Sequence, residues 1–321
     1  MNITKKAAAV LLLIQLLLGP SDVKAQASET VFNFLRLPTS AHVAALGGDN
    51  VSIDDGEAAL VFHNPALLSN EGASGMVGLN MMTYMQGCLT GSASFSKNVG
   101  ERAAWGVQGR FITYGEMKET TYTGEQTGTF SAHDMSLGGT FAYRLWEGVS
   151  GGITAKMVSG YIGNYSSLAA AVDLGLSYQD AERGWSIGAV ARNLGGQLSA
   201  FDDEFEPMPL DLQLGVTKRL IGAPLRFSAT LVRLNDWQYG IGRHLVVGAD
   251  ILLSDQFYIA GGYNALRAEE MKISSADGES SHGAALSLGA GMRLDRIQLH
   301  VAYGSYHVSA PSLVINFNYK L

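Results

Sequence analysis

Polar and apolar residues alternate along this chain from about residue 74 to residue 321, in segments of about ten residues separated by turns. Such alternation places one set of side chains on each face of a β-strand. In one segment, Leu212 and Leu214 alternate with Asp211 and Gln213. We count fourteen segments, at 74–84, 87–97, 102–114, 131–145, 149–161, 167–178, 185–195, 209–219, 225–234, 243–253, 256–266, 282–294, 296–306 and 312–321. An even number of strands, at ~9 to 11 residues per bilayer crossing, predicts an all-β fold: a transmembrane antiparallel β-barrel of about 14 strands.

The lengths of the connections favour a membrane barrel over a soluble β-sandwich. Every second connection is short, and outer-membrane barrels have their short turns on the periplasmic side. The remaining connections include the four longest, at 115–130, 196–208, 235–242 and 267–281, which we assign to the outside. A β-sandwich does not predict this segregation. The tryptophans also fall near strand ends or connections, as in aromatic girdles: Trp105, Trp146, Trp185 and Trp237.

Composition agrees with export to the outer membrane. Residues 1–25 have the pattern of a signal peptide, with Lys5-Lys6, an apolar run that is too short for a membrane helix, and a small-residue site before Gln26. The single cysteine, Cys88, leaves no internal disulfide. Charged residues make up only 16% of the chain, and acidic residues outnumber basic ones by 29 to 22, which argues against a nucleic-acid partner.

A different pattern precedes the strands. Residues 41–46 have helix-like apolar spacing that ends at Gly47-Gly48, and Asn64-Pro65 marks a sharp break. We predict that this stretch is a plug, or hatch, around which the strands close. The expected organisation is a signal peptide at 1–25, an N-terminal plug at 26–72 and an outer-membrane β-barrel at 73–321.

No sequence motif indicates an enzyme. The seven histidines show no H-E-x-x-H or paired-ligand spacing, there is no G-x-S-x-G, and the glycine pairs do not open helices after strands. The run Asp54-Asp55-Gly56-Glu57 lacks the alternating order of a calcium loop. We therefore predict no catalytic residue, no cofactor and no metal ligand, and we interpret the glycines as places where the wall bends or where the plug approaches it closely.

One set of charges suggests how the plug is held. If the apolar face of each strand points outward, four arginines point into the lumen near the periplasmic ends of their strands: Arg144, Arg219, Arg226 and Arg293. The plug carries Asp49, Asp54, Asp55 and Glu57. Arginine suits bidentate pairing with carboxylates in a partly desolvated lumen, so these eight residues are predicted plug–barrel contacts. The alternative is that the arginines pair with the lumen acids Asp173, Asp211 and Asp250.

The predicted outside loops concentrate acidic residues around a few large apolar ones. We propose as partner-docking residues Phe201, Asp202, Asp203, Glu204, Phe205 and Trp237. A one-signed rim steers a basic partner or binds divalent cations shared with lipopolysaccharide, while aromatic residues supply most of the interface energy. The alternative is a solvated surface that binds nothing.

The plug sequence also resembles a known family. F-N-F-L-R-L-P-T-S-A-H-V-A-A-L-G-G-D-N-V-S at 32–52, with V-F-H-N-P-A-L-L at 61–68, resembles the start of the PorV/PorQ outer-membrane proteins of the type IX secretion system. The N-P-A-L element is also similar to the hatch of the FadL-type transporters, which are fourteen-stranded barrels. The resemblance covers about 35 residues, beyond which only length and strand pattern agree.

The secretion-family resemblance implies a non-enzymatic outer-membrane docking protein. It would hold a surface partner similar to PorZ in the complex, with PorU and PorV, that attaches secreted cargo to lipopolysaccharide. The rival hypothesis is a FadL-like transporter of hydrophobic small molecules. A transporter needs an apolar pocket, whereas the predicted lumen carries Thr90, Ser92, Ser94, Gln213 and His300. On sequence alone, we therefore favour docking.

Overall fold

A computed structural model describes residues 30–69, 72, 74–236, 240–275, 278–280, 283, 285–308 and 310–321. The predicted signal peptide at 1–25 and Trp237 lie outside these residues. Fourteen strands form one closed antiparallel barrel, in which each strand pairs with its sequence neighbours and β1 pairs with β16. The predicted fold class is therefore confirmed. No helix among the described residues is long and apolar enough to cross a membrane.

The barrel strands agree closely with the alternating segments of the sequence. Their bounds are β1 Met76–Thr83, β2 Leu89–Val99, β3 Ala103–Thr120, β4 Gln126–Trp146, β5 Val149–Ile162, β6 Tyr165–Asp180, β7 Trp185–Ser199, β8 Asp211–Arg219, β9 Leu225–Leu231, β10 Leu245–Leu252, β11 Phe257–Asn264, β14 Leu286–Arg293, β15 Ile297–His307 and β16 Ala310–Lys320. All the predicted short connections lie at one end of the barrel, which we call the short-turn end. The opposite end, the long-loop end, carries the long connections.

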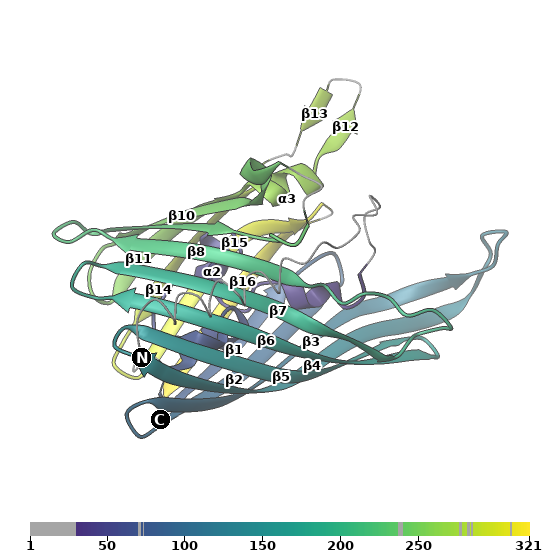
Figure 1. The fold of residues 1–321 in the computed structure, drawn as a ribbon. Coiled ribbons are helices and arrows are strands. Elements are labelled where there is room, and N and C mark those ends of the chain that lie inside the picture. Colours follow the sequence, from purple (N-terminus) through teal and green to yellow (C-terminus); the bar gives the residue numbers. More distant parts are fainter. Residues whose placement is uncertain are drawn as a thin grey trace.

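The loop predicted at 115–130 is mostly strand. β3 and β4 continue as a paired hairpin beyond the rest of the wall, and only residues 121–125 connect them. Figure 1 shows this hairpin projecting at the long-loop end. The connection between β11 and β14 contains α3 (Ala265–Glu270) and the short strands β12 (Ile273–Ser275) and β13 (Gly278–Ser280). η5 (Ile241–His244) precedes β10.

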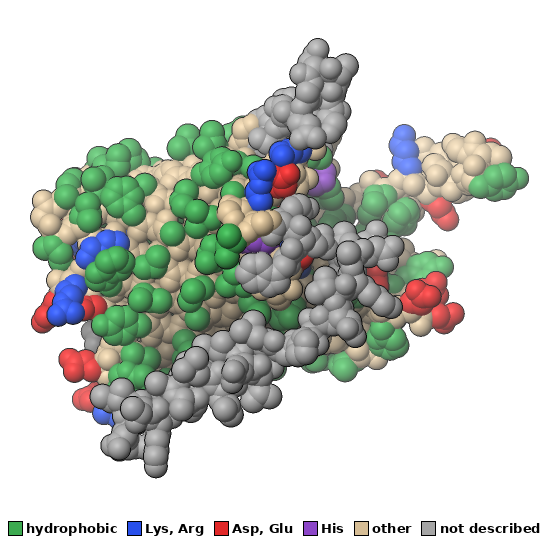
Figure 2. Space-filling view, turned by 45° about the horizontal axis from the view of Figure 1, so that its top comes forward, with side chains coloured by type: hydrophobic (Ala, Val, Ile, Leu, Met, Phe, Trp, Pro, Cys, Tyr) green, Lys and Arg blue, Asp and Glu red, His purple; other side chains and the backbone are tan. Residues whose placement is uncertain are grey.

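The outer face of the wall is apolar. Side chains such as Leu137, Ile153 and Leu214 are about half exposed, whereas their inward neighbours are buried. Figure 2 shows hydrophobic side chains over the middle of the wall, with charged side chains gathered toward the ends. Trp105, Trp146 and Trp185 point outward beside the short turns, so three of the four predicted girdle tryptophans lie at one rim. This exterior is that of a barrel embedded in lipid.

The plug, residues 30–69, fills the lumen. It consists of η1 (Asn33–Arg36), α2 (Ala41–Ala45), η2 (Ala58–Phe62) and η3 (Pro65–Ser69), and nearly all its side chains from residue 37 onward are buried. α2 begins at Ser40, whose hydroxyl accepts from the Val43 amide, and ends before Gly47 and Gly48, which have φ angles of 106° and 98°. The helix therefore ends at the glycine pair, as predicted. In Figure 1 the purple plug helices lie within the ring of strands.

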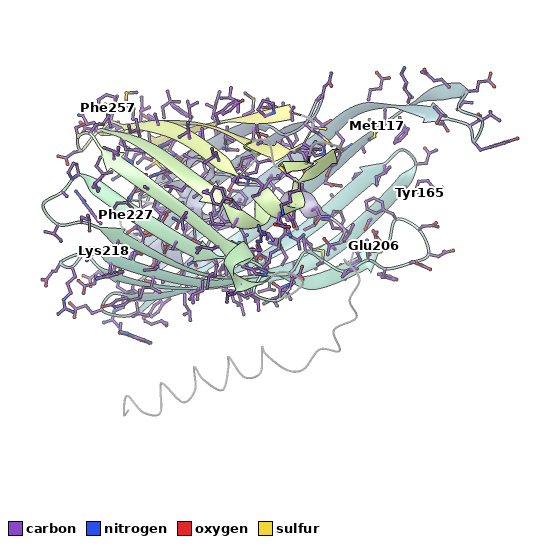
Figure 3. The ribbon with its side chains drawn as sticks, turned by 90° about the horizontal axis from the view of Figure 1, so that it is seen from above. Met117, Tyr165, Glu206, Lys218, Phe227 and Phe257 are labelled. Atoms are coloured by element: carbon purple, nitrogen blue, oxygen red, sulfur yellow. The ribbon has the colours of Figure 1, made fainter. Side chains whose placement is uncertain are left out.

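The plug runs from one end of the lumen to the other. The Val31 amide donates to the carbonyl of Pro207 in the β7–β8 loop, so the described chain starts at the long-loop end. The chain leaves at the short-turn end, where the Gly75 amide donates to Ser96 and the Leu321 amide donates to Gly75. Figure 3 shows the two ends apart, with Phe227 and Phe257 near one and Met117 and Glu206 near the other.

Candidate functional site

Asp55, in the turn between α2 and η2, sits at the centre of a buried charge cluster near the short-turn end. Its Oδ1 lies 2.6 Å from Nη1 of Arg226 on β9, and its Oδ2 lies 2.8 Å from Nη2 of Arg293 on β14. Arg226 also donates from Nε to Oδ2 of Asp250 on β10, at 2.7 Å. The Asp55 carboxylate is only 3% exposed. Because both its oxygens are paired with arginines, Asp55 fastens the plug to two separate parts of the wall.

His42 of α2 bridges two carboxylates of this cluster. Its Nδ1 lies 2.6 Å from Oδ2 of Asp55, and its Nε2 lies 2.6 Å from Oδ1 of Asp250. Burial lowers the pKa of His42, but the two carboxylates outweigh burial and raise that pKa to about 10. Burial likewise raises the pKa of Asp55, but Arg226, Arg293 and His42 hold it well below its usual range.

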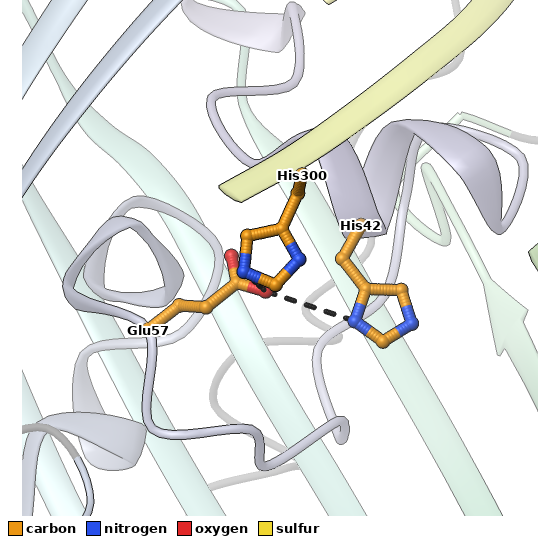
Figure 4. A group of neighbouring side chains, drawn as sticks. All are labelled: His42, Glu57 and His300. Carbon is orange, nitrogen blue, oxygen red and sulfur yellow. Dashed lines mark ion pairs between the residues drawn. The ribbon is translucent and has the colours of Figure 1, made fainter. Parts of the chain in front are cut away.

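Glu57 and His300 meet beside His42. Glu57 accepts from the Ser40 hydroxyl at Oε2, at 2.7 Å, while its Oε1 lies 3.6 Å from Nε2 of His300 on β15 and 3.7 Å from Nδ1 of His42. Nδ1 of His300 lies 2.7 Å from the hydroxyl of Tyr258. Glu57 and His300 are fully buried, and neither Glu57 Oε1 nor His300 Nε2 has a hydrogen-bond partner in the described part of the chain. Figure 4 shows the three side chains converging on one point.

A second group of polar side chains holds the plug where β8 begins. Arg192 of β7 donates from Nη2 to Oδ2 of Asp211 at 2.6 Å and lies 3.3 Å from Oδ1 of Asp49 in the plug. Gln213 of β8 donates to the same Asp49 oxygen at 2.9 Å. The plug thus contacts the wall through polar side chains on β7 and β8 as well as on β9 and β14.

An ion pair between two residues of the wall lies next to this second group of polar side chains. Lys156 of β5 donates from Nζ to both oxygens of Asp173 on β6, at 2.7 and 2.8 Å, and to Oδ1 of Asn193 on β7, at 2.6 Å. Asn193 lies at a register shift between β6 and β7 and has a left-handed φ of 62°. Its own amide donates to Asp173 at 2.7 Å. The bulge therefore brings three strands onto one buried carboxylate.

The long-loop half of the lumen contains an apolar cluster beside the buried Arg110, whose Nη1 donates to the backbone carbonyl of Leu35 at 3.1 Å. Residues from the start of the plug pack with residues of β3, β5, β6 and the β7–β8 loop: Val31, Phe32, Phe34, Leu35, Ile112, Val158, Ala169, Ala171 and Met208. Half-buried Leu37, Tyr84, Tyr114 and Phe201 complete this group, which we call the apolar cluster. Phe32 adopts a left-handed φ of 56°, which costs about 1–2 kcal/mol for an L residue, and its ring packs against Phe201 at 6.0 Å between centroids. Packing therefore holds the first turn of the plug in a strained conformation.

Glycines of the wall allow the plug backbone to touch the strands. A Cβ on Gly152 would lie 2.4 Å from the carbonyl carbon of Pro65, and a Cβ on Gly188 would lie 2.0 Å from the carbonyl oxygen of Val51. A Cβ on Gly262 would lie 2.1 Å from the backbone of Leu46. The interpretation of glycines as points of close plug approach agrees with this geometry.

The structure brings together some of the predicted plug–barrel residues but not all of them. Asp55, Arg226 and Arg293 meet as described above. Asp49 and Glu57 also contact the wall, but through Arg192 and Gln213 for Asp49 and through His300 for Glu57. The alternative partners participate as well, since Arg226 pairs with Asp250 and with Asp55 at once. The two pairing hypotheses are therefore not exclusive.

Asp54, Arg219 and Arg144 are not among the ion pairs described above. Asp54 is exposed, whereas its neighbour Asp55 points into the cluster. Arg219 is exposed at the end of β8, and in the described chain no ion pair or hydrogen bond joins its side chain to the plug. Arg144 is half-buried at the end of β4, in register with Ser150 of β5. Arg219 lies in register with Arg226 of β9, and of these two neighbouring arginines it is Arg226 that pairs with the plug carboxylate.

Four residues of the site lie outside the predicted set of plug–barrel contacts: Arg192, His42, His300 and Tyr258. Arg192 adjoins a bulge that interrupts the alternation of inward and outward side chains along β7. The alternation therefore does not predict which way the Arg192 side chain points. His300 was placed in the lumen by alternation, but nothing in the sequence indicates that it meets His42, because their contact depends on how the plug sits.

The predicted docking residues divide between two environments. Phe201 is half-buried against Phe32, so it belongs to the apolar cluster of the lumen. Phe205 is 65% exposed, and Asp202, Asp203 and Glu204 beside it are exposed too. Of the two phenylalanines, only Phe205 is presented to the outside.

Comparisons with known proteins bear on the fold. No family model matches the sequence, and no curated protein sequence matches it. Among solved structures, the Pseudomonas putida toluene transporter TodX matches with a TM-score of 0.56 and 14% identity, over 88% of this chain and 96% of that one. A Pseudomonas aeruginosa FadL homologue gives 0.54 and 12% over 88% and 98%, and the CymD monoaromatic hydrocarbon channel gives 0.58 and 14% over 90% and 99%. At these identities the likeness shows a shared FadL-like barrel fold.

Proposed function

We propose that this chain is a non-enzymatic outer-membrane channel that admits small hydrophobic molecules. The observation that carries the proposal is the apolar cluster, which lies in the long-loop half of the lumen where the plug begins. A ligand site for an apolar molecule is concave, mostly apolar and rimmed by a few polar groups, and Tyr84 and Tyr114 supply such a rim. The plug's own Phe32 and Phe34 occupy this place, and an apolar ligand would replace them.

The fold supports the same proposal by analogy. Proteins described as a toluene transporter and as a monoaromatic hydrocarbon channel share this barrel. Fold alone does not fix function, so the analogy adds weight only because an apolar lumen accompanies it. The polar lumen residues that favour docking on sequence alone, such as Gln213 and His300, are not members of the apolar cluster.

Uptake of a radiolabelled monoaromatic hydrocarbon by a Gram-negative host without its own hydrocarbon channels tests the proposal. We expect cells with the wild-type barrel to take up the label several-fold faster than cells with an empty vector. Met208→Glu places a charge in the apolar cluster from a loop, so it leaves the strands unchanged and should return uptake toward the vector level. Phe205→Ser, in the same loop but exposed, is the matched control. Uptake at the vector level by a folded wild-type barrel would refute the proposal.

A second candidate is the docking function implied by the PorV/PorQ resemblance. The observation that favours it is the exposed Phe205 among exposed acids at the long-loop end. An exposed aromatic residue surrounded by charge suits a surface protein similar to PorZ, held near lipopolysaccharide with PorU and PorV. Replacing Phe205 by Ser should release such a partner from cells while the barrel still assembles. Full retention of the partner would exclude this loop as the docking site.

A further inference from the structure

We propose that His42, Glu57 and His300 form a binding site for a divalent transition-metal ion of the zinc class, and that the ion fastens the plug to the wall. The candidate ligand atoms are Nδ1 of His42, Oε1 of Glu57 and Nε2 of His300, which all lie within 4.8 Å of one another. Two ligand atoms come from the plug and one comes from β15. Figure 4 shows them turned toward a common point.

The spacing of the atoms suits a metal better than direct hydrogen bonding. Glu57 Oε1 lies 3.6 Å from His300 Nε2 and 3.7 Å from His42 Nδ1, beyond the length of an ordinary hydrogen bond. Two nitrogen or oxygen ligands at ~2.1 Å from a tetrahedral zinc ion are about 3.4 Å apart. A small inward movement of each side chain would therefore complete the coordination.

Two of the atoms are left unsatisfied in a place where that is costly. Glu57 is 2% exposed and His300 is fully buried, and within the described chain neither Glu57 Oε1 nor His300 Nε2 has a hydrogen-bond partner. A buried polar atom without a partner costs about 1–3 kcal/mol. Both atoms point into the space between the three side chains, so one ion there would satisfy both.

In each candidate ligand residue, the side-chain polar atom that faces away from the proposed ion already has a polar partner. Asp250 binds Nε2 of His42 at 2.6 Å, Ser40 donates to Oε2 of Glu57 at 2.7 Å, and Tyr258 lies 2.7 Å from Nδ1 of His300. Such outer contacts orient metal ligands and fix the histidine tautomer, and a carboxylate behind a ligating histidine is a recurrent arrangement. These contacts orient the three side chains, and the inner atoms of Glu57 and His300 have no hydrogen-bond partner among the described residues.

Asp55 is the competitor for Nδ1 of His42. Its Oδ2 lies 2.6 Å from that nitrogen, so an ion that binds there would displace the Nδ1 proton to solvent. Asp55 would keep its pairing with Arg226 and Arg293. Two imidazoles with one or two carboxylates are ligands that zinc accepts readily.

Metal analysis of untagged, folded barrel in detergent tests the proposal. We expect about one zinc ion per chain after zinc addition and dialysis, and a cobalt-substituted protein with the visible absorption of a four-coordinate site. His300→Gln should remove both signals. His133→Gln removes an imidazole from the outer face of β4 and is the matched control, so it should retain both.

Each outcome decides the proposal. If wild-type barrel that shifts on gels after boiling binds no zinc and gives no cobalt spectrum, the cluster is a hydrogen-bonded network and the site does not exist. If His300→Gln binds as much metal as His133→Gln, the ion lies elsewhere and the proposal is wrong. Should His300→Gln fail to fold, Glu57→Gln and the wild-type cobalt spectrum still answer the question. None of these readouts depends on transport, so the result stands apart from the proposed function.

Discussion

The Asp55 carboxylate of the plug lies 2.6 Å from the Arg226 guanidinium of β9, and the same guanidinium holds Asp250 of β10 at 2.7 Å. One arginine thereby joins the plug to the wall and one strand to the next. Removing one member of a buried ion pair leaves an uncompensated charge, which costs about 3–5 kcal/mol.

Asp55→Asn should therefore loosen the plug, because Arg293 loses its carboxylate partner and Arg226 keeps only Asp250. We expect a lower midpoint of urea unfolding and more frequent channel opening in planar bilayers. Asp255→Asn, in an exposed turn at the same end of the barrel, is the control and should behave as wild type. Equal behaviour of the two variants would mean that apolar packing, rather than charge, holds the plug.

Gly152→Ala should displace η3, because the new Cβ would meet the backbone of Pro65 at 2.4 Å and neither backbone can yield cheaply. Gly151→Ala, on the lipid-facing side of the same strand, would meet only ordinary contacts from 3.4 Å outward and should be nearly neutral. Limited proteolysis of the folded barrels compares the two. Equal protection of the plug in both would show that β5 and η3 are not in close contact.

Lys156→Met should destabilise the barrel by about 3–5 kcal/mol, because Asp173 would remain buried without its cation. Adding Asp173→Asn should restore part of the loss, since no unpaired charge then remains. Urea unfolding of the single and double variants measures the effect. A double variant less stable than the single one would show that the Asp173 carboxylate is required for its contact with the Asn193 amide.

Phe201→Ser should loosen the first turn of the plug, whereas Phe205→Ser should not. Phe201 packs on Phe32, and removing that contact takes away support for a strained backbone. Hydrogen exchange at residues 31–36 reports the difference. Faster exchange in Phe205→Ser than in Phe201→Ser would contradict the assignment of Phe201 to the lumen.

The strands were predictable because lipid imposes a strict two-residue period. Leu214 and Val301 face outward and Gln213 and His300 face inward, as their parity requires. The hairpin beyond Tyr114 was missed because it extends past the rest of the wall, where pairing alone keeps residues such as Glu116 and Lys118 in strand conformation.

The site was predictable only in part. The alternation of side chains along β9 predicts that Arg226 points into the lumen, and the acidic residues of the plug are visible in the sequence. The plug has no regular repeat, however, so the sequence does not predict that Asp55 is buried while its neighbour Asp54 is exposed. The meeting of His42 with His300 depends on the docking of one element against another. The residues around His42 and around His300 in the sequence do not indicate that the two side chains meet.

Photoaffinity labelling with an apolar aromatic diazirine tests the central claim most directly. The barrel is labelled in detergent, digested and mapped by mass spectrometry, with unlabelled monoaromatic hydrocarbon as competitor. If small hydrophobic molecules enter the apolar cluster, competable label will fall on Phe32, Phe34 and Met208. Label confined to lipid-facing residues such as Leu137 and Leu214, with no competition by the hydrocarbon, would contradict the account.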